Sequence, residues 1–391
     1  MTADGDAHGA YFDHAATTPV DERVLEAMLP YFTERAGNAS ELHAWGRAAK
    51  EGLERARAQV AAALGARERE IVFTSGGTES DNLAIVGLLQ QEPPAHLVIS
   101  AVEHPAVTAA ARFLEHQGWE VAVVPVDADG TLDLDAFVRE LRQDTKLVSV
   151  MLANNVVGTL QPVRELAALA HERGIVVHTD AVQAVGSIPV NVDELGIDML
   201  SLSGHKLYAP KGIGALYVRR GIRVRPLIHG GGQERGLRSG TENVAGAVGL
   251  GAAVQMAVEA LPQTTAHVQA LRDRLIDGIL ATVPDVTLLG HRTNRLPGNV
   301  CVSVRFIEGE SMVLRLDQAG FAVSSGSACA SQSLEPSHVI LAMGRDAVAA
   351  HGSLRLSLGR ENTVEQVDRF LNVFPGIVAD LRAMSPLSVS G

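Results

Sequence analysis

The sequence contains few cysteines: its 391 residues include two, Cys301 and Cys329. A disulfide framework needs several paired cysteines and an oxidising compartment, so this count excludes a small, disulfide-stapled secreted protein. Two cysteines so far apart in the chain also lack the ligand spacing of a structural zinc site. We expect no metal site and a reducing, cytoplasmic location.

The sequence also lacks an excess of basic residues and a long apolar run. It has 33 Lys and Arg against 45 Asp and Glu, a formal net charge of −12, which disfavours bulk attraction to nucleic acid or anionic membranes. Its richest apolar stretch, residues 244–258, is interrupted by glycines and Gln255, and residues 1–6 are polar, unlike a signal peptide. We expect no direct nucleic-acid partner and no membrane partner.

What the sequence does have is enough apolar material for large cores. Hydrophobic residues make up 46% of the chain, which excludes disorder as a description of the whole protein, and the length suits two or three domain-sized units. Short β-rich apolar runs alternate with longer helical stretches, which predicts an α/β fold with a mainly parallel sheet covered by helices on both faces. The expected strands are residues 71–73, 97–100, 121–126, 147–152, 175–179, 199–203 and 215–219, the last with the option of running antiparallel.

The pattern changes after Pro262. A long amphipathic helix at about 264–283 leads to strands near 286–289 and 300–304 and then to a polar loop. This predicts a smaller α+β domain made of residues 1–17 and 263–391, with a large domain of residues 18–262. The polar loop, at about 323–334, contains Cys329.

Two residues at successive strand ends suggest the chemistry. Asp180 and Lys206 each follow an apolar strand, at the edge where open α/β sheets bind ligands. A lone aspartate there is ordinarily a helix N-cap. A lysine at a buried strand end, however, has a depressed pKa and a free amine, as covalent binding of a carbonyl cofactor requires. Together the two residues favour a pyridoxal phosphate site.

Two further features supply the rest of such a site. Residues 75–78 form a Gly-Gly turn between a strand and a helix, where backbone N–H groups bind phosphate, although such turns often bind nothing. His104 follows another strand and can stack on a cofactor ring; a lone histidine there is more often a capping or surface residue. Because all these residues lie at strand ends of one predicted sheet, together they indicate a pyridoxal phosphate site more strongly than any one of them does alone.

The two cysteines have different surroundings. Cys301 lies among apolar strand residues, which indicates packing, whereas Cys329 lies among small polar residues, which indicates a reactive thiol on a mobile loop. Arg355 lies on a later apolar strand. Its fork suits the carboxylate of an amino-acid substrate, but an internal salt bridge explains it equally well.

With these residues in place, the sequence resembles the cysteine desulfurases of the NifS/IscS type, which are class V, fold-type I pyridoxal-phosphate enzymes. The resemblance covers nearly the whole chain. It is carried by residues 11–19, 73–82, 230–241 and 323–329, the last of which marks the subgroup with a longer cysteine loop. It implies a seven-stranded type of sheet, a homodimer and conversion of L-cysteine to L-alanine.

The resemblance also implies a role for each site residue. Lys206 would bind pyridoxal phosphate covalently, Asp180 would pair with its pyridine nitrogen, and His104 would stack and move protons. Cys329 would take the substrate sulfur as a persulfide and pass it to an acceptor protein, such as an iron–sulfur scaffold or a thiolation enzyme. Remaining contacts to the cofactor and substrate would come from Gly77, Thr78, Gln183, Ser203, His205, Thr241 of the partner subunit, Asn155, Arg355 and Asn38.

The sequence departs from the family at a few positions. Ala39 and Glu41 replace a proline and a serine, Val156 replaces a glutamate, which we interpret as a charge missing beside the cofactor, and the chain ends soon after Leu387. These departures leave the sulfur acceptor open. They also leave three alternatives: a desulfurase dedicated to one pathway, a selenocysteine-lyase-like enzyme, and a catalytically silent platform.

Overall fold

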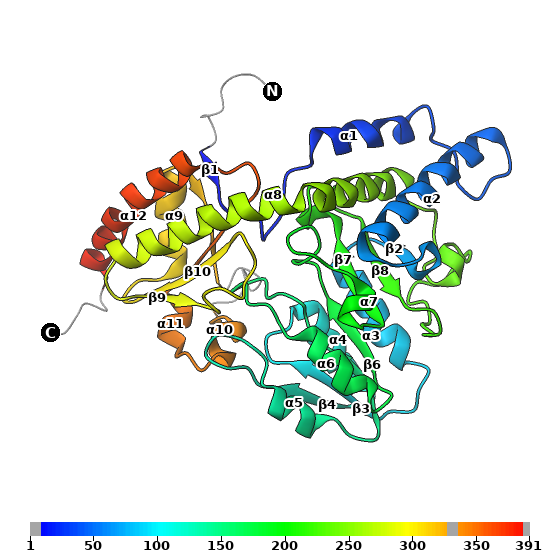
Figure 1. Cartoon of the computed structure of the whole chain (residues 1–391), viewed down its shortest axis with the longest axis horizontal. Coiled ribbons are helices and arrows are strands. Elements are labelled where there is room, and N and C mark those ends of the chain that lie inside the picture. Colours follow the sequence, from blue (N-terminus) through cyan, green and yellow to red (C-terminus); the bar gives the residue numbers. More distant parts are fainter. Residues whose placement is uncertain (1–8, 327–334, 386–391) are drawn as a thin grey trace.

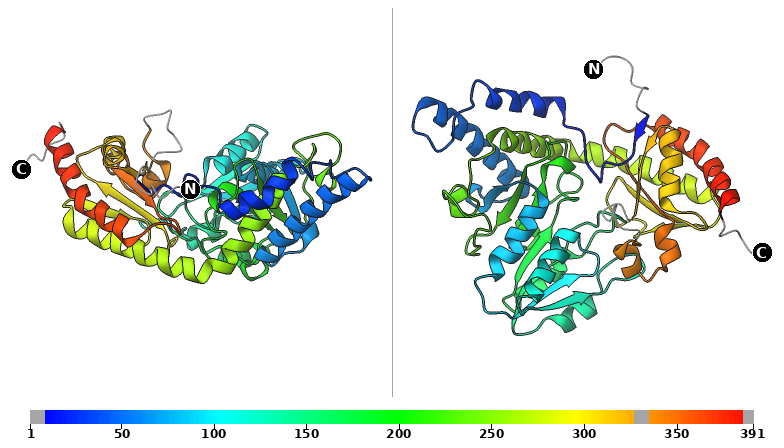
Figure 2. Two further views of the ribbon diagram at one scale, coloured as in Figure 1. Left: turned by 90° about the horizontal axis from the view of Figure 1, so that it is seen from above. Right: turned by 180° about the vertical axis from the view of Figure 1, so that it is seen from behind.

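The computed structural model describes residues 9–326 and 335–385. This part of the chain forms a larger and a smaller lobe, which are connected along one side by a long helix (Figures 1 and 2). Each lobe has its own sheet and its own cluster of buried apolar side chains. A functional site between the lobes would contain residues from both.

The larger lobe is built on a seven-stranded sheet. Its strands run parallel except β8, which is antiparallel to both of its neighbours. The central strands are buried along their whole length, as expected where helices cover both faces. The predicted α/β fold with a mainly parallel sheet is therefore confirmed. In spatial order the strands are β2 (Ile71–Thr74), β8 (Gly214–Val218), β7 (Met199–Ser203), β6 (Val176–Asp180), β5 (Thr145–Ser149), β3 (His96–Ser100) and β4 (Glu120–Val124).

Alternate side chains of these strands enter two apolar layers. In β3, Leu97 and Ile99 pack with α3 (Gly77–Leu89) and α4 (Pro105–Glu115), whereas Val98 enters the layer on the opposite face. The helices that contribute to that opposite layer include α2 (Ala44–Leu64), α5 (Leu134–Glu140), α6 (Val163–His171) and α7 (Val192–Leu195). Because both faces are covered, the sheet's carboxyl edge is the place left for a ligand.

The smaller lobe contains a four-stranded antiparallel sheet and the N-terminal strand. Strand β1 (Ala10–Tyr11) pairs with β11 (Phe321–Ala322), so the start of the chain joins its last third. The sheet has the order β12 (Ser324–Ser325), β13 (Ser353–Ser357), β10 (Asn299–Val304) and β9 (Val286–Leu289). Its helices are α9 (Gly309–Gln318), α10 (His338–Ala342), α11 (Ala347–His351) and α12 (Val364–Met384).

Helix α8 (Val244–Thr282) corrects one expectation from the sequence. Pro262 was expected to precede a new helix, but the structure runs through it in a single helix of 39 residues. Proline inside a helix costs about 3 kcal/mol. Val254 on one side of Pro262 lies in the core of the larger lobe and Val268 on the other side lies in that of the smaller lobe, so packing at both ends offsets this cost. The domain limits at residues 17/18 and 262/263 stay a prediction.

Helix α8 is also long and apolar enough to cross a membrane by length and composition, the only such helix found in the described residues. Half of its most apolar stretch is buried inside the protein. The helix packs on α2, α1 (Glu22–Met28) and α12, so its apolar surface is used within the fold.

An apolar cluster between the lobes changes the interpretation of Val156. This side chain is buried and packs with Val102 and Met151 of the larger lobe and with Val339 and Met343 at α10 and its end. The sequence suggested a charge missing beside the cofactor. In the structure, Val156 instead belongs to the contact that joins the lobes.

Val156→Glu is therefore expected to destabilise the protein, because a carboxylate in this cluster loses its hydration without gaining a partner. The expected loss is about 3 kcal/mol of unfolding free energy, measured by urea denaturation. Val123→Glu, at a half-exposed edge-strand valine, is the matched control and should change stability by less than about 0.5 kcal/mol. Equal stability of Val156→Glu and wild type would refute this packing role.

Candidate active site

A cavity of about 300 Å³ lies at the carboxyl ends of the parallel strands. Its walls include Asp180 at the end of β6, Ser203 at the end of β7, His104 after β3 and Asn155 after β5. The smaller lobe adds Arg355 from β13. Parallel strands bring their ends to one edge and the smaller lobe adds to it, so the residues that face this space extend in sequence from Ala15 to Arg355.

Asp180 lies on the floor of the cavity. Its Oδ1 accepts a hydrogen bond from the backbone N–H of Val182 at 2.8 Å. Burial raises the pKa of the Asp180 carboxyl, while that hydrogen bond and the charge of Lys206 lower it. The two lowering effects favour an ionised carboxylate that can face a cationic group in the cavity.

Lys206 enters the same cavity from the short helical turn η3 (Gly204–Lys206) that follows β7. Its Nζ donates hydrogen bonds to the carbonyl oxygens of Ala15 at 2.5 Å and Ala16 at 2.7 Å. Gln183 Nε2 donates to the Ala15 carbonyl at 3.0 Å. The N-terminal segment thus orients both side chains.

His104 is both the N-cap of α4 and a wall of the cavity. Its Nδ1 accepts a hydrogen bond from the Ala106 N–H at 3.1 Å, so in the neutral ring Nε2 carries the proton. Burial, with the charges of Lys206 and His338, lowers the pKa of His104 to about 4. The neutral ring therefore keeps its Nε2–H as a hydrogen-bond donor, and the capping role that the sequence also allowed is present as well.

A second hollow, of about 390 Å³, opens beside the first at the start of α3. Gly77 and Thr78 line it with Ser203 and His205. A Cβ at Gly77 would lie 2.7 Å from Val182 Cγ2, so glycine is needed for this close approach. Backbone N–H groups at a helix start, together with hydroxyls, favour a phosphate here.

His205 and Lys211 also line that hollow, as do Thr17, Ser75 and Glu79. The Glu79 carboxylate pairs with Arg238 at 3.0 Å. His205 Nδ1 lies 3.2 Å from Thr17 Oγ1, and burial with the charges of Lys206 and Lys211 lowers the pKa of His205 to about 4. The Lys211 cation had no role in the sequence analysis. Its position in residues 204–214, between β7 and β8, was the available signal.

Arg355 makes the internal salt bridge that the sequence allowed and also faces the cavity. Its Nη2 donates to Asp13 Oδ1 at 3.0 Å and its Nη1 donates to the backbone carbonyl of Asn155 at 3.0 Å. The guanidinium is nearly fully buried and lines the cavity. Asp13, which sequence reasoning missed, orients this cation.

Some predicted residues do not meet at the cavity. Asn38 and Thr241 are exposed and do not line it within this chain. Cys329 lies outside the described residues. Cys301 is fully buried in β10, where burial raises the pKa of its thiol to about 11, consistent with packing.

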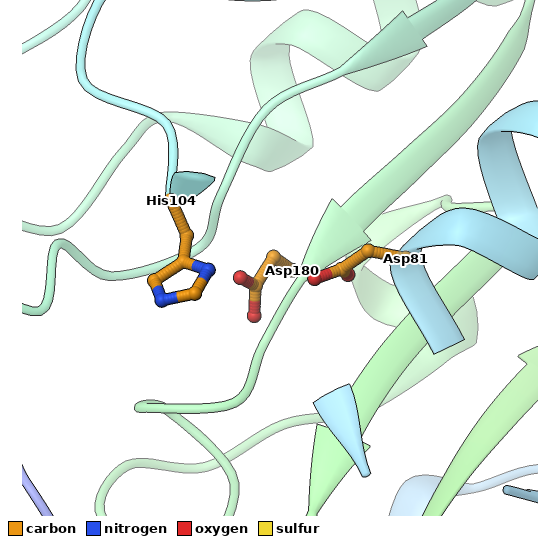
Figure 3. A group of neighbouring side chains, drawn as sticks. All are labelled: Asp81, His104 and Asp180. Atoms are coloured by element: carbon orange, nitrogen blue, oxygen red, sulfur yellow. The ribbon is translucent and has the colours of Figure 1, made fainter. Parts of the chain in front are cut away.

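The structure also reveals acidic residues that the sequence analysis did not assign. Asp81 of α3 lies next to Asp180 and lines the cavity, and its carboxyl, that of Asp180 and the His104 ring offer polar atoms that all lie within 4.8 Å of one another (Figure 3). Glu103, beside His104, is completely buried. Both residues lie in motifs already singled out, but tertiary packing was needed to show that they are buried.

Comparisons with known proteins agree with this geometry. Residues 10–370 match the family described as aminotransferase class-V. A cysteine desulfurase of Gluconacetobacter diazotrophicus is 54% identical over 382 residues, which cover 97% of this chain and 96% of that protein. Among solved structures, a NifS-like protein has a TM-score of 0.90 at 39% identity, over 95% of this chain and 100% of that chain.

A second solved structure, described as "SspA in complex with cysteine", has a TM-score of 0.80 at 38% identity and covers 90% of this chain and 100% of that chain. The family match spans both lobes and therefore both walls of the cavity. This chain belongs to the aminotransferase class-V family, in which the relatives that it matches over nearly their full length are cysteine desulfurases.

Proposed function

We propose that this chain is a cysteine desulfurase that uses pyridoxal phosphate to convert L-cysteine to L-alanine and keeps the sulfur as a persulfide on Cys329. One observation carries the proposal. A single cavity contains the Lys206 amine, the buried Asp180 carboxylate and the Arg355 guanidinium. The first two fit the cofactor, and the third fits the carboxylate of an amino-acid substrate.

The side chains present fit pyridoxal phosphate. Lys206 would hold it covalently, Asp180 would face its pyridine nitrogen, and His104 would lie against its ring. When bound, this cofactor supplies an electron sink for a carbanion at the substrate Cα. Its phosphate fits the hollow at the start of α3, where Gly77, Thr78, Ser203, His205 and Lys211 offer backbone, hydroxyl, imidazole and ammonium donors.

The chain's own residues divide the remaining work. The Arg355 guanidinium, held by Asp13, would bind the substrate carboxylate with the help of the Asn155 side chain. His104 is neutral, with the Ala106 N–H on Nδ1, and would donate its Nε2–H in the cavity; carrying a proton would require Nδ1 to release the Ala106 N–H. The Lys206 amine would act as the second proton carrier.

The sulfur step balances without an added oxidant or reductant. The Cys329 thiolate forms an S–S bond with the substrate sulfur, the substrate Cβ–S bond breaks, and Cβ receives a proton. The products are L-alanine and the Cys329 persulfide. The chain has two cysteines and Cys301 is buried with a raised pKa, which supports Cys329 as the nucleophile.

A homodimer and a sulfur-acceptor protein complete the proposal. Thr241 is exposed in this chain, which suits a contribution to the partner subunit's phosphate site. Three exposed apolar residues lie near the start of α2: Phe32, Leu42 and Trp45. Such residues are typical of a surface that a second copy of the chain covers in a dimer. An iron–sulfur scaffold and a thiolation enzyme both fit as acceptors of persulfide sulfur, and a cytoplasmic location suits either.

Lys206→Ala should abolish the visible absorbance of the lysine-bound cofactor, because the amine that bonds to it is gone. The absorbance of purified protein after dialysis measures this. Lys146→Ala is the control: it removes an exposed lysine that faces Glu92 and does not line the cavity, so the colour should remain. Colour retained by Lys206→Ala would contradict the assignment.

Cys329→Ala should keep the cofactor absorbance but lose persulfide formation. Mass spectrometry after brief incubation with L-cysteine, with alanine quantified in the same sample, measures both products. Cys301→Ala, which removes the buried thiol, should still gain one sulfur at Cys329. The nucleophile assignment fails if Cys329→Ala forms alanine and sulfide at the wild-type rate.

Arg355→Lys should raise KM for L-cysteine by about 10–100-fold, because a two-pronged contact to the carboxylate becomes a point charge. Steady-state kinetics would measure the split between KM and kcat. Arg274→Lys alters an exposed pair with Asp368 and should leave both constants unchanged. An unchanged KM in Arg355→Lys would assign Arg355 to the internal ion pair alone.

A further inference from the structure

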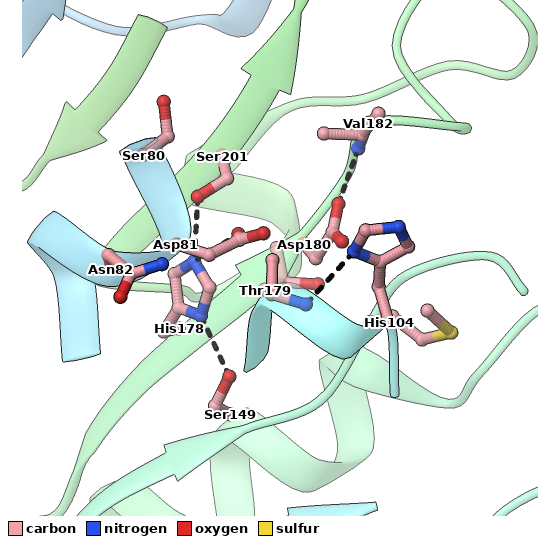
Figure 4. A network of polar contacts seen from close by, with 12 residues as sticks. Ser80, Asp81, Asn82, His104, Ser149, His178, Thr179, Asp180, Val182 and Ser201 are labelled. Atoms are coloured by element: carbon pink, nitrogen blue, oxygen red, sulfur yellow. Dashed lines mark hydrogen bonds and ion pairs between the residues drawn. The ribbon is translucent and has the colours of Figure 1, made fainter. Parts of the chain in front are cut away.

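Three buried carboxyl groups gather beneath the cavity. Asp180 comes from β6 and Asp81 from α3 (Figure 4), and Glu103 comes from the turn after β3. Their exposed fractions are 6%, 1% and 0%. The pyridine nitrogen of the proposed cofactor needs one negative charge opposite it. Three adjacent carboxylates would repel one another strongly in a buried site.

Asp180 has the best surroundings for a negative charge. It accepts the Val182 N–H at 2.8 Å and feels the charge of Lys206. The two neighbouring imidazoles, His104 and His178, do not add positive charge, because burial is the largest cause that lowers their pKa values, to about 4 and about 3.

Asp81 lacks such support. Its Oδ1 is buried and has no hydrogen-bond partner among the residues that the structure describes. The nearest ring nitrogen, His178 Nε2, lies 3.7 Å away, and His178 is held between the hydroxyls of Ser149 at 2.8 Å and Ser201 at 3.0 Å. Burial raises the pKa of Asp81 well above its usual range; the charges of Asp180 and Glu103 add to the rise, and a hydrogen bond with Ser201 opposes it.

Glu103 is also only partly satisfied. Its Oε1 accepts hydrogen bonds from Ser100 Oγ at 2.5 Å and from the Met151 N–H at 2.9 Å, which tie the ends of β3 and β5 together. Its Oε2 is buried and has no partner in the described part of the chain. Burial raises the pKa of Glu103 to about 8, with Asp180 adding to the rise. His338 contacts its backbone carbonyl.

We propose that Asp81 and Glu103 are positioning residues that stay protonated and thereby leave a single negative charge, on Asp180, beneath the cofactor. The inference rests on the proposed function, because that charge serves the pyridine nitrogen. An ionised Asp81 or Glu103 would drive the proton onto Asp180. Asp180 would then lose the charge that binds the ring.

Protonation of Glu103 links stability to pH. Between its ordinary pKa of 4.5 and its folded pKa of about 8, the folded protein keeps a proton that the unfolded chain has released. Stability therefore falls as pH rises through this window, and the loss is complete above about pH 8. A glutamine, which resembles the protonated acid, does not titrate and should remove this part of the decline.

Three variants of the full-length protein carrying its cofactor test the inference: Glu103→Gln, Asp81→Asn and Asp180→Asn. The unfolding midpoint of each would be followed from about pH 5.5 to 8.5, and the dissociation constant for pyridoxal phosphate would be measured by absorbance. We expect Glu103→Gln to flatten the decline of the midpoint. Glu103→Gln and Asp81→Asn should change the dissociation constant by less than about 3-fold, and Asp180→Asn should raise it by about 100-fold.

The inference is overturned if Asp81→Asn or Glu103→Gln weakens cofactor binding as much as Asp180→Asn, because the wild-type residue would then be ionised. If a variant does not fold, a measurement on the wild-type protein takes its place. Infrared spectroscopy near neutral pH should then show the C=O stretch of protonated carboxyl groups. Its absence would also overturn the inference. Failure of the proposed function would give a different result. The wild-type protein would then show no cofactor absorbance, whatever the pH profile of Glu103→Gln.

Discussion

The negative charge on Asp180 is the constraint on which the rest of the site depends. A carboxylate in a protein interior is costly unless donors and a cation face it. The ends of two strands supply both. The loop after β6 places the Val182 N–H against the Asp180 carboxylate, and β7 ends just before Lys206. His104 caps its own helix and stays neutral, so it touches the cavity without competing for that charge.

The proposed binding of the substrate carboxylate depends on both lobes. Arg355 belongs to β13 of the smaller lobe, and its partner Asp13 follows β1, the strand that pairs with β11 in that lobe. The guanidinium nevertheless donates to the Asn155 carbonyl of the larger lobe. Helix α8 and the apolar cluster around Val156 hold this contact across the lobes. The placement of Arg355 relative to Asp180 thus depends on the packing of both lobes around this contact.

Site residues could be predicted from the sequence where their position follows from strand order alone. Asp180 and Lys206 end neighbouring parallel strands, so their meeting could be expected. Asp81 and Glu103 could not be assigned, because their roles depend on how deeply helix α3 and a turn are buried against β6. The prediction of a helix boundary at Pro262 was wrong for a related reason. Packing of α8 onto two cores outweighs the local preference of proline to interrupt a helix.

The cores also explain why sulfur chemistry needs a segment apart from the sheets. A thiol reacts as the thiolate, and burial disfavours the thiolate. Cys301, in the middle of β10, has its pKa raised to about 11 and touches Leu289 across the sheet, so the rigid framework makes it inert. Burial also raises the pKa of Asp180, to about 6, but a backbone donor and a cation limit the rise. A nucleophile that must approach the substrate and then leave for an acceptor cannot be fixed by such contacts, which favours the polar segment that contains Cys329.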